Sequence, residues 1–198
     1  MLFSHVWGLA SHTKEEWKDI DQHHEGIGAS LLHLLLVALI PAICSYFSTV
    51  HIGWHVGDNR FYLTAGSALY MSVAMYGALT IGVMSLAYAA LWMAKTFNAD
   101  TTYQQTLELS AYVATPLFMV GFATLYPEPW FVMLAGLVGV AYAVYLLYTG
   151  VPIIMHIPEE RGFIYASSLV TVGLVMLVCI MISTVILWST GTGPVFTN

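Results

Sequence analysis

Charged residues are scarce in this sequence. Of its 198 residues only 8% are Asp, Glu, Lys or Arg, whereas 59% are hydrophobic. An ordinary soluble domain has roughly a quarter of its residues charged. The mean hydropathy of +0.77 agrees with this shortage. The composition therefore excludes an ordinary soluble domain and indicates a chain that resides in a lipid bilayer.

Several functional signatures are missing as well. The sequence has no basic run and no alternation of basic with aromatic residues, which argues against a nucleic-acid partner. It lacks HExxH, G-x-S-x-G and glycine-rich phosphate-binding motifs, so we do not expect an enzyme. The polar, amphipathic start differs from a cleavable signal peptide. The two cysteines, Cys44 and Cys179, fall in apolar stretches, where cysteine behaves as a small hydrophobe.

What the sequence does contain is a series of five long intervals free of Asp, Glu, Lys and Arg. Each reaches the ~18 to 20 residues that a helix needs to cross ~30 Å of hydrocarbon. Backbone amides in lipid must bond within the protein, and no alternating pattern indicates a β-barrel. We therefore predict an all-α integral membrane protein: a bundle of five transmembrane helices with a short amphipathic N-terminal helix on the cytoplasmic side. The predicted spans are residues 28–49, 64–94, 108–126, 130–150 and 165–189.

The basic residues predict which way the bundle faces. If the N-terminus is cytoplasmic, the positive charges gather on the inner side, as the positive-inside rule requires. The inner basic residues are then Lys14, Lys18, Lys95 and Arg161, and the outer one is Arg60. We predict residues 1–27 as a cytoplasmic segment, residues 28–198 as the transmembrane domain, and a periplasmic C-terminus.

Prolines and one carboxylate mark positions that could bend a helix or line a pore. Pro41 lies inside the first predicted span, Pro116 inside the third, and Pro152 just past the fourth. An interior proline removes a backbone hydrogen bond, and broken helices line substrate sites in some transporters. Glu108 opens the third span, and we interpret it as a first-turn carboxylate favoured by the helix dipole. With Tyr112, these positions motivate an alternative function, a small transporter or channel for an ion or small solute.

Polar chemistry gathers before the first span. Ser11 or Thr13 can cap a short helix, Glu16 has capping-box spacing from Thr13, and Gly26 can stop the helix. Inside the first span, His33 is expected to be an interfacial or hydrogen-bonded histidine rather than a proton relay.

The same segment suggests a metal site. At 100° per residue, four zinc-type ligands share a narrow arc of the expected helix: His12, Glu16, Asp19 and His23. A divalent-metal-binding membrane protein with zinc as cofactor is therefore a second alternative. The competing interpretation is an interfacial helix whose polar face happens to contain these residue types. His51 and His55 form a weaker version of the same pattern.

Four stretches spread along the chain resemble one family. They are HVWGLASHTKEEWKDI, HLLLVALIPAICSYFSTVHIGW, AYVATPLFMVGF and YLLYTGVPIIMHIPEERGFIYASSL. Their most specific pieces are Tyr112, Thr115 and Pro116, and the stretch from Tyr145 through Gly150 and Pro152 to Pro158. In this order and spacing they resemble the small bacterial inner-membrane branch of the Yip (Ypt-interacting protein) family. The resemblance implies five helices, a cytoplasmic N-terminus and a single Yip-type domain.

Function transfers less readily than fold. Eukaryotic Yip members are associated with prenylated Rab-type GTPases, and many carry a longer cytosolic region with a DLYGP-like motif. This chain has no such motif, so we do not expect a Rab-type partner. The leading prediction is a non-enzymatic polytopic inner-membrane protein that organises membrane or partner proteins. Its first partner is the lipid bilayer, and a homo-oligomer or a membrane-protein partner can form through faces of small residues.

Overall fold

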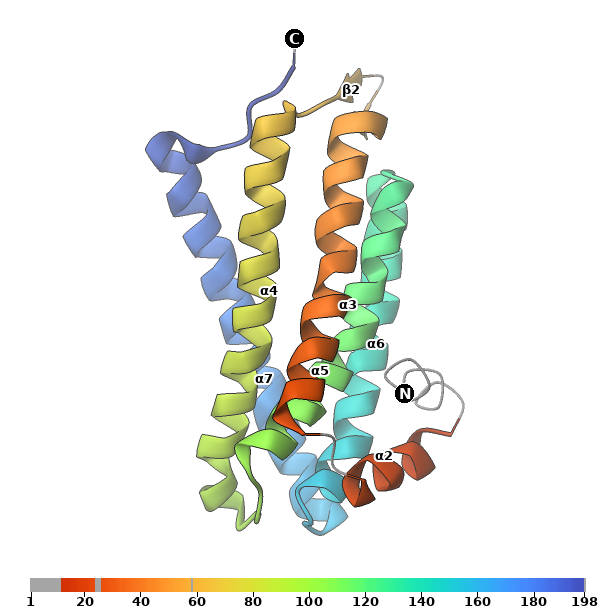
Figure 1. Ribbon diagram of the computed structural model, residues 1–198, viewed down its shortest axis with the longest axis vertical. Helices are drawn as coiled ribbons and strands as arrows, with labels where there is room; N and C mark the ends of the chain where they lie inside the picture. Colours follow the sequence, from red (N-terminus) through yellow and green to blue (C-terminus); the bar gives the residue numbers. More distant parts are fainter. Residues whose placement is uncertain (1–11, 24–25, 58, 198) are drawn as a thin grey trace.

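The structure, a computed structural model, describes residues 12–23, 26–57 and 59–197 and forms a bundle of long helices (Figure 1). The elements in chain order are α2 (Thr13–Gln22), α3 (Ile27–Phe47), η1 (Ser48–Ile52), β1 (Trp54–Val56), β2 (Asn59–Phe61), α4 (Ala65–Ala94), η2 (Lys95–Phe97), α5 (Tyr103–Met119), η3 (Val120–Leu125), α6 (Pro129–Ile154), α7 (Glu159–Leu187) and η4 (Trp188–Thr192). Residues 1–11 of the predicted cytoplasmic segment, Ser11 among them, lie outside the described residues.

The prediction of five membrane spans is confirmed. Five helical stretches are long and apolar enough to cross a membrane: Ile27–Ile52, Ala65–Phe97, Tyr103–Leu125, Pro129–Ile154 and Glu159–Gly191. Each extends beyond its predicted range at one end or both. The chain is therefore a multi-pass membrane protein in contact with the bilayer.

The helices are packed unequally. α3, α5 and α7 begin at the end of the bundle where α2 lies, and α4 and α6 run back toward it (Figure 1). α5 contacts α3, α4 and α6. In the most apolar 18-residue stretch of each span, 67% of the α5 span is buried within the protein but only 6% of the α7 span. α5 is therefore the central helix, and α7 is the one most exposed to lipid.

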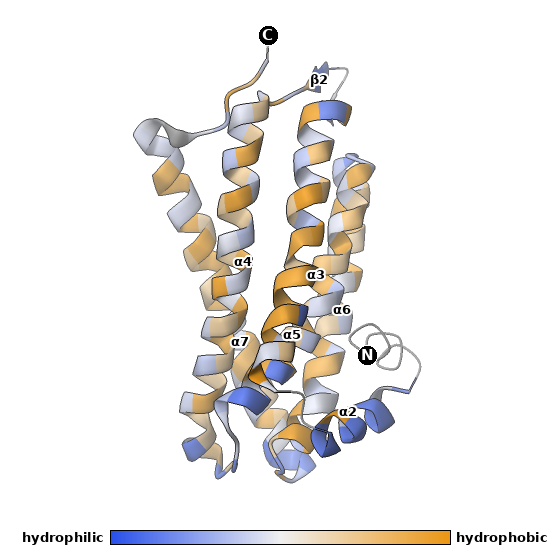
Figure 2. Ribbon diagram, viewed as in Figure 1, coloured by the Kyte–Doolittle hydropathy of each residue, from blue (hydrophilic) through white to orange (hydrophobic). Residues whose placement is uncertain are grey.

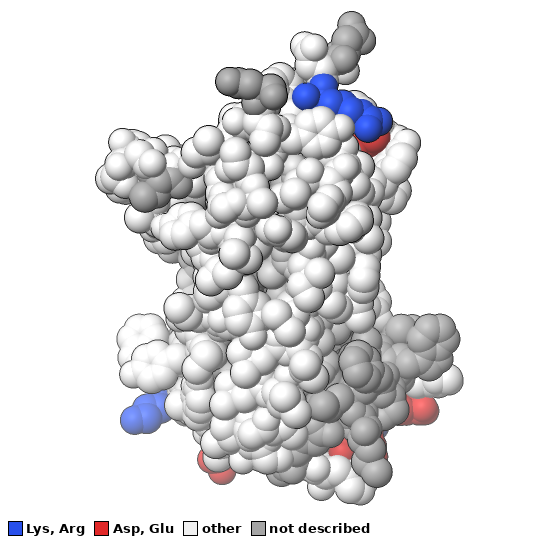
Figure 3. Space-filling view, turned by 45° about the horizontal axis from the view of Figure 1, so that its top comes forward, with Lys and Arg blue, Asp and Glu red and all other residues white. Residues whose placement is uncertain are grey.

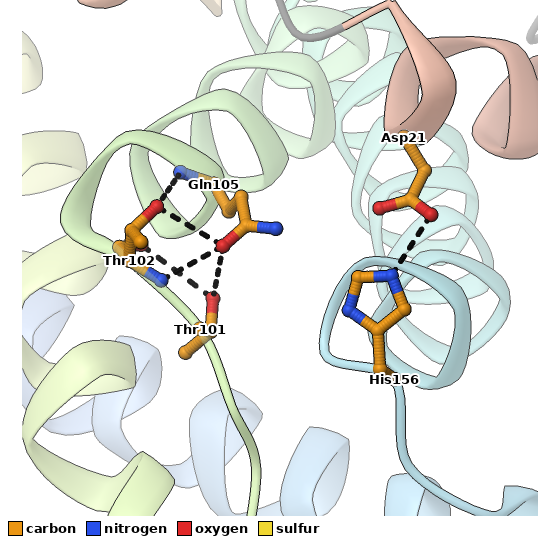
Figure 4. A network of polar contacts seen from close by, with 5 residues as sticks. All are labelled: Asp21, Thr101, Thr102, Gln105 and His156. Carbon is orange, nitrogen blue, oxygen red and sulfur yellow. Dashed lines mark hydrogen bonds and ion pairs between the residues drawn. The ribbon is translucent and has the colours of Figure 1, made fainter.

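The start of α5 corrects one prediction. Thr102 Oγ1 accepts a hydrogen bond from the Gln105 amide at 3.4 Å, and the Thr102 amide donates to Gln105 Oε1 at 2.8 Å (Figure 4). This capping box satisfies amides that a helix start leaves unbonded, so α5 begins at Tyr103. The predicted start at Glu108 was wrong, and Glu108 lies in the second turn of the helix.

Other predicted helix ends also move. α2 begins at Thr13 with His12 as its N-cap, so Thr13 is not the capping residue. α2 ends at Gln22, and Gly26 is the N-cap of α3 rather than the stop of α2. Pro152 lies inside α6, not past the fourth span, because that helix continues to Ile154.

The end of the bundle opposite α2 is closed by a hairpin and the C-terminal tail. β1 and β2 pair antiparallel with His55 opposite Arg60. The tail pairs with the segment that leads into α4. The Thr64 amide donates to the Val195 carbonyl at 2.9 Å, and the Thr197 amide donates to the Tyr62 carbonyl at 3.0 Å.

Polar residues gather at the two ends of the bundle (Figure 2). The face in Figure 3 shows Lys, Arg, Asp and Glu only toward its ends, with an uncharged surface between them. A protein that crosses hydrocarbon requires such an apolar belt.

Candidate functional site

Five polar side chains are buried along the contact between α3 and α5. α3 contributes Ser30 and His33, and α5 contributes Glu108, Tyr112 and Thr115; we call these residues the polar cluster. Glu108 is 1% exposed, although its charge would ordinarily favour water. Ionisable residues inside a membrane bundle are costly and often mark functional sites. The polar cluster is therefore the first candidate site.

A hydrogen-bond chain links the two helices in this cluster. The Thr115 hydroxyl donates to the Ala111 carbonyl at 3.0 Å, and His33 Nε2 lies 2.9 Å from Thr115 Oγ1. Because the hydroxyl has only one proton, Thr115 Oγ1 accepts from His33, and Nε2 carries a proton. The expected hydrogen-bonded state of His33 is confirmed.

Aromatic contacts connect the cluster to α2. The Tyr112 ring lies 4.8 Å from the His33 ring and 6.3 Å from the Trp17 ring, measured between centroids, and the Trp17 contact is edge-on at 87°. Trp17 is 0% exposed. Among the described residues, no hydrogen-bond partner is found for Trp17 Nε1 or for Ser30 Oγ. Buried polar atoms are usually hydrogen-bonded, so these two are exceptions among the described residues.

α2 is held mainly by apolar contact. Trp17 and Ile20 are its buried hydrophobic residues. Polar contacts add to this, among them a hydrogen bond that His156 Nε2 donates to Asp21 Oδ2 at 3.0 Å (Figure 4) and a distance of 3.9 Å between Lys14 and Glu159. Such exposed pairs contribute about 0 to 1 kcal/mol. The docking of α2 therefore depends chiefly on Trp17 and Ile20.

A groove of about 560 Å³ adjoins the cluster between α5–η3 and α6. Tyr112, Thr115 and Pro116 line it on the α5 side. Pro116 has no amide proton, so the Tyr112 carbonyl loses its usual helical donor. A Cβ on Gly139 would lie 3.4 Å from the Pro116 carbonyl oxygen, which shows how closely α6 approaches this turn.

The predicted pore or kink positions do not form one site. Tyr112 and Pro116 line the same groove, and Glu108 lies one turn before Tyr112. Pro41 instead packs against Gly121 of η3, where a Cβ would lie 2.5 Å from Pro41 Cα. Pro152 packs against Gly162 in the first turn of α7. The prolines therefore shape separate helix contacts.

Replacing Thr115 with Val should destabilise the contact between α3 and α5. The valine keeps the shape but leaves the His33 Nε2 proton without its acceptor, which costs about 1 to 3 kcal/mol. Thermal unfolding in detergent, followed by circular dichroism, should show a lower Tm. Thr149→Val is the matched control, because among the described residues the Thr149 hydroxyl bonds to carbonyls of its own helix. Equal Tm values for the two variants would contradict the assigned hydrogen bond.

The structure brings together only part of the predicted zinc ligands. Asp19 and His23 lie 3.1 Å apart, and His12 is the N-cap of α2. In the part of the chain that the structure describes, no three His, Cys, Asp or Glu side chains could hold a metal ion together. The site formed by these residues and Glu16 stays a prediction.

The weaker histidine pair has other contacts. His55 Nε2 accepts from Arg60 Nε, and His55 Nδ1 lies 2.8 Å from Glu128 Oε1. His51 packs its ring 4.9 Å from the Phe47 ring. His55 thus links the hairpin to Glu128 at the start of α6.

Trp17 and Ser30 belong to the site or contact it, but they were not predicted as site residues. The available signal for Trp17 was its spacing with Ile20 on an otherwise charged segment. Thr115 belonged to the motif that carried the family resemblance, but its bond to His33 joins residues 82 positions apart.

Comparisons with known proteins agree with the fold. The model of the Yip1 domain matches residues 7–180. The "Inner membrane protein YohC" of Escherichia coli (strain K12) is 37% identical over 190 residues, which is 95% of this chain and 97% of that protein. The YohC protein of E. coli O6:H1 (strain CFT073) matches to the same extent. No solved structure matches.

The family match covers most of the chain, and the similar protein aligns over almost all of both sequences. The predicted family is therefore confirmed: the chain belongs to the Yip1 domain family.

Proposed function

We propose that this protein is a non-enzymatic polytopic inner-membrane protein that organises partner proteins, and that the outer half of α7 is its contact surface. The supporting observation is the uneven packing of α7. Its first turns are buried against the bundle, whereas its later large side chains face away from it.

The packed part of α7 is firmly attached. The Tyr165 hydroxyl donates to the Ala90 carbonyl of α4, and the Tyr165 ring lies 4.8 Å from the Phe97 ring. Beyond Leu169 the helix carries a run of exposed side chains. They are Leu174, Val175, Leu177, Val178, Ile180, Met181, Ile182, Val185, Ile186, Leu187 and Trp188. In a membrane, a helix presented this way can pack against another helix through van der Waals contact.

A groove between α4 and α7 supports the same role. It has a volume of about 540 Å³ and is lined by α4 side chains, including Tyr88 and Trp92, and by Met176 of α7. A transmembrane helix of a partner can place side chains there and bury Trp92, which is 75% exposed.

The proposed orientation has a cytoplasmic N-terminus and a periplasmic C-terminus. α2 carries Lys14 and Lys18, and Lys95 and Arg161 lie where α4 ends and α7 begins, at the same end of the bundle. Arg60 lies in the hairpin at the other end. Positive-inside bias then puts α2 in the cytoplasm. The relative named as an inner membrane protein supports placement in that membrane.

A photocrosslinking experiment tests the role of α7. Benzoylphenylalanine is introduced at Val185 and, as a matched lipid-facing control, at Leu137 of α6, which is 67% exposed. In native membranes, Val185 should give a discrete protein adduct and Leu137 should not. An adduct of about twice the 21.8 kDa chain mass indicates a homo-oligomer, and another mass indicates a different membrane protein. Adducts from neither position, or equal adducts from both, would remove the proposal.

A further inference from the structure

The groove between α5–η3 and α6 is polar at one end only. α5 runs away from the α2 end and α6 runs back toward it (Figure 1). Tyr112, Thr115 and Tyr142 therefore line the groove at the α2 end, and Ala123 and Phe131 line it at the other. Its volume of about 560 Å³ lies within the roughly 300 to 1,000 Å³ typical of small-molecule sites.

This groove opens to the lipid. Leu134 and Val138 belong to its lining, yet they are 54% and 63% exposed on α6. Both residues lie inside a membrane span. A molecule dissolved in the bilayer can therefore enter from the side without crossing water.

At its polar end the groove meets groups that bind a hydroxylated head. Tyr112 and Thr115 belong both to the groove and to the polar cluster. Trp17 is not part of this lining, because its ring contacts Tyr112 and is 0% exposed. The two groove hydroxyls are therefore the groups that a ligand head meets. A hydroxylated head can both donate to and accept from such groups.

An anionic head is disfavoured at this place. All of the Lys and Arg residues are exposed, so none lies buried beside the cluster. Glu108 lies four residues before Tyr112, about 6 Å along the helix axis. Burying an anion without a cationic partner is strongly unfavourable. The site therefore selects a neutral head.

We propose that this groove binds a neutral single-chain lipid, with its hydroxylated head beside Tyr112 and Thr115 and its chain along α6 toward Phe131. This binding does not require the proposed role of α7, which uses a different face of the bundle.

The test uses a monoacylglycerol with a photoactivatable diazirine in its chain, added to the whole protein in phosphatidylcholine vesicles. Labelled residues are mapped by mass spectrometry. We expect labelling of α5, η3 and α6 side chains that line the groove, and we expect excess unlabelled monoacylglycerol to suppress it. If excess unlabelled monoacylglycerol does not reduce the labelling, the probe is only in ordinary contact with the protein as bulk lipid, and the proposal is overturned.

Two comparisons sharpen this test. Ala135→Phe fills the groove and should reduce labelling about tenfold, whereas Ala141→Phe on the exposed side of α6 should leave it unchanged. An alkyl sulfate probe with the same chain should label about tenfold less than the neutral probe. Equal labelling of the two variants, or equal labelling by the two probes, contradicts the proposed site.

Discussion

Replacing Gly121 with Ala should lower the free energy of unfolding by about 3 kcal/mol, near the upper end of the usual overpacking cost. A Cβ at this position would lie 2.5 Å from Pro41 Cα and 2.8 Å from Pro41 N. Both atoms belong to the α3 backbone and to the ring of Pro41, so they cannot rotate away from the added Cβ as a flexible side chain could. The added methyl must therefore separate η3 from α3.

Thermal unfolding of the purified protein in detergent measures this effect. For a chain of this length, a loss of that size lowers Tm by about 10 °C. Gly136→Ala is the control, because nothing lies within 4 Å of a Cβ at that helical position. It should unfold at an unchanged or higher temperature, since Ala favours a helix over Gly. If Gly121→Ala were as stable as Gly136→Ala, the close contact with Pro41 would be wrong.

Trp17→Ala is expected to detach α2 from the bundle. The side chain is fully buried, and removing a buried tryptophan costs about 3 to 5 kcal/mol. The other contacts of α2 include one buried isoleucine and exposed polar pairs, and such pairs are too weak to replace that loss. The helix should then open locally while the five spans remain folded.

Limited trypsin digestion reports this opening, because Lys14 and Lys18 lie within α2. Cleavage there should accelerate at least about tenfold in Trp17→Ala, since 1.4 kcal/mol already changes an equilibrium tenfold. Trp92→Ala removes an exposed tryptophan from α4 and should leave the rate unchanged. Equal cleavage rates in the two variants would show that Trp17 does not anchor α2.

A second substitution tests the same contact from the opposite side. A Cβ on Gly150 would lie 2.7 Å from Trp17 Cε2, so Gly150→Ala should also release α2. In the Trp17→Ala background the clash with Trp17 disappears, and only the contact at 2.8 Å with the end of the flexible Leu109 side chain remains. Gly150→Ala should then add much less than it does alone. Such non-additivity is expected for residues in contact. Simple addition of the two effects would contradict the contact.

The number of spans could be predicted because lipid solubility depends on composition over whole stretches. The error at Glu108 has a local cause. The predicted span began at Glu108, the charged residue directly before the uncharged interval. The helix itself begins earlier, because Thr102 and Gln105 form a capping box. Spacing S/T-x-x-Q was present in the sequence and could have indicated this start.

The contacts that form the site could not be predicted in the same way. Apolar residues surround each span on all sides, so periodicity does not distinguish the face toward α5 from the face toward lipid. His33 and Thr115 come into contact because of how far α3 and α5 are shifted along each other. No sequence pattern predicts that shift. The approach of Gly121 to Pro41 likewise depends on three-dimensional packing.

The pairing of residues 195–197 with the entry to α4 has a consequence for biosynthesis. These residues follow the last span, yet they bond to Tyr62 and Thr64, which precede the second. The ribosome adds the tail only after the segments of all five helices have been synthesised. The backbone pairing between residues 195–197 and the entry to α4 can therefore form only at the end of translation or later. It is among the last steps in the folding of this end of the molecule.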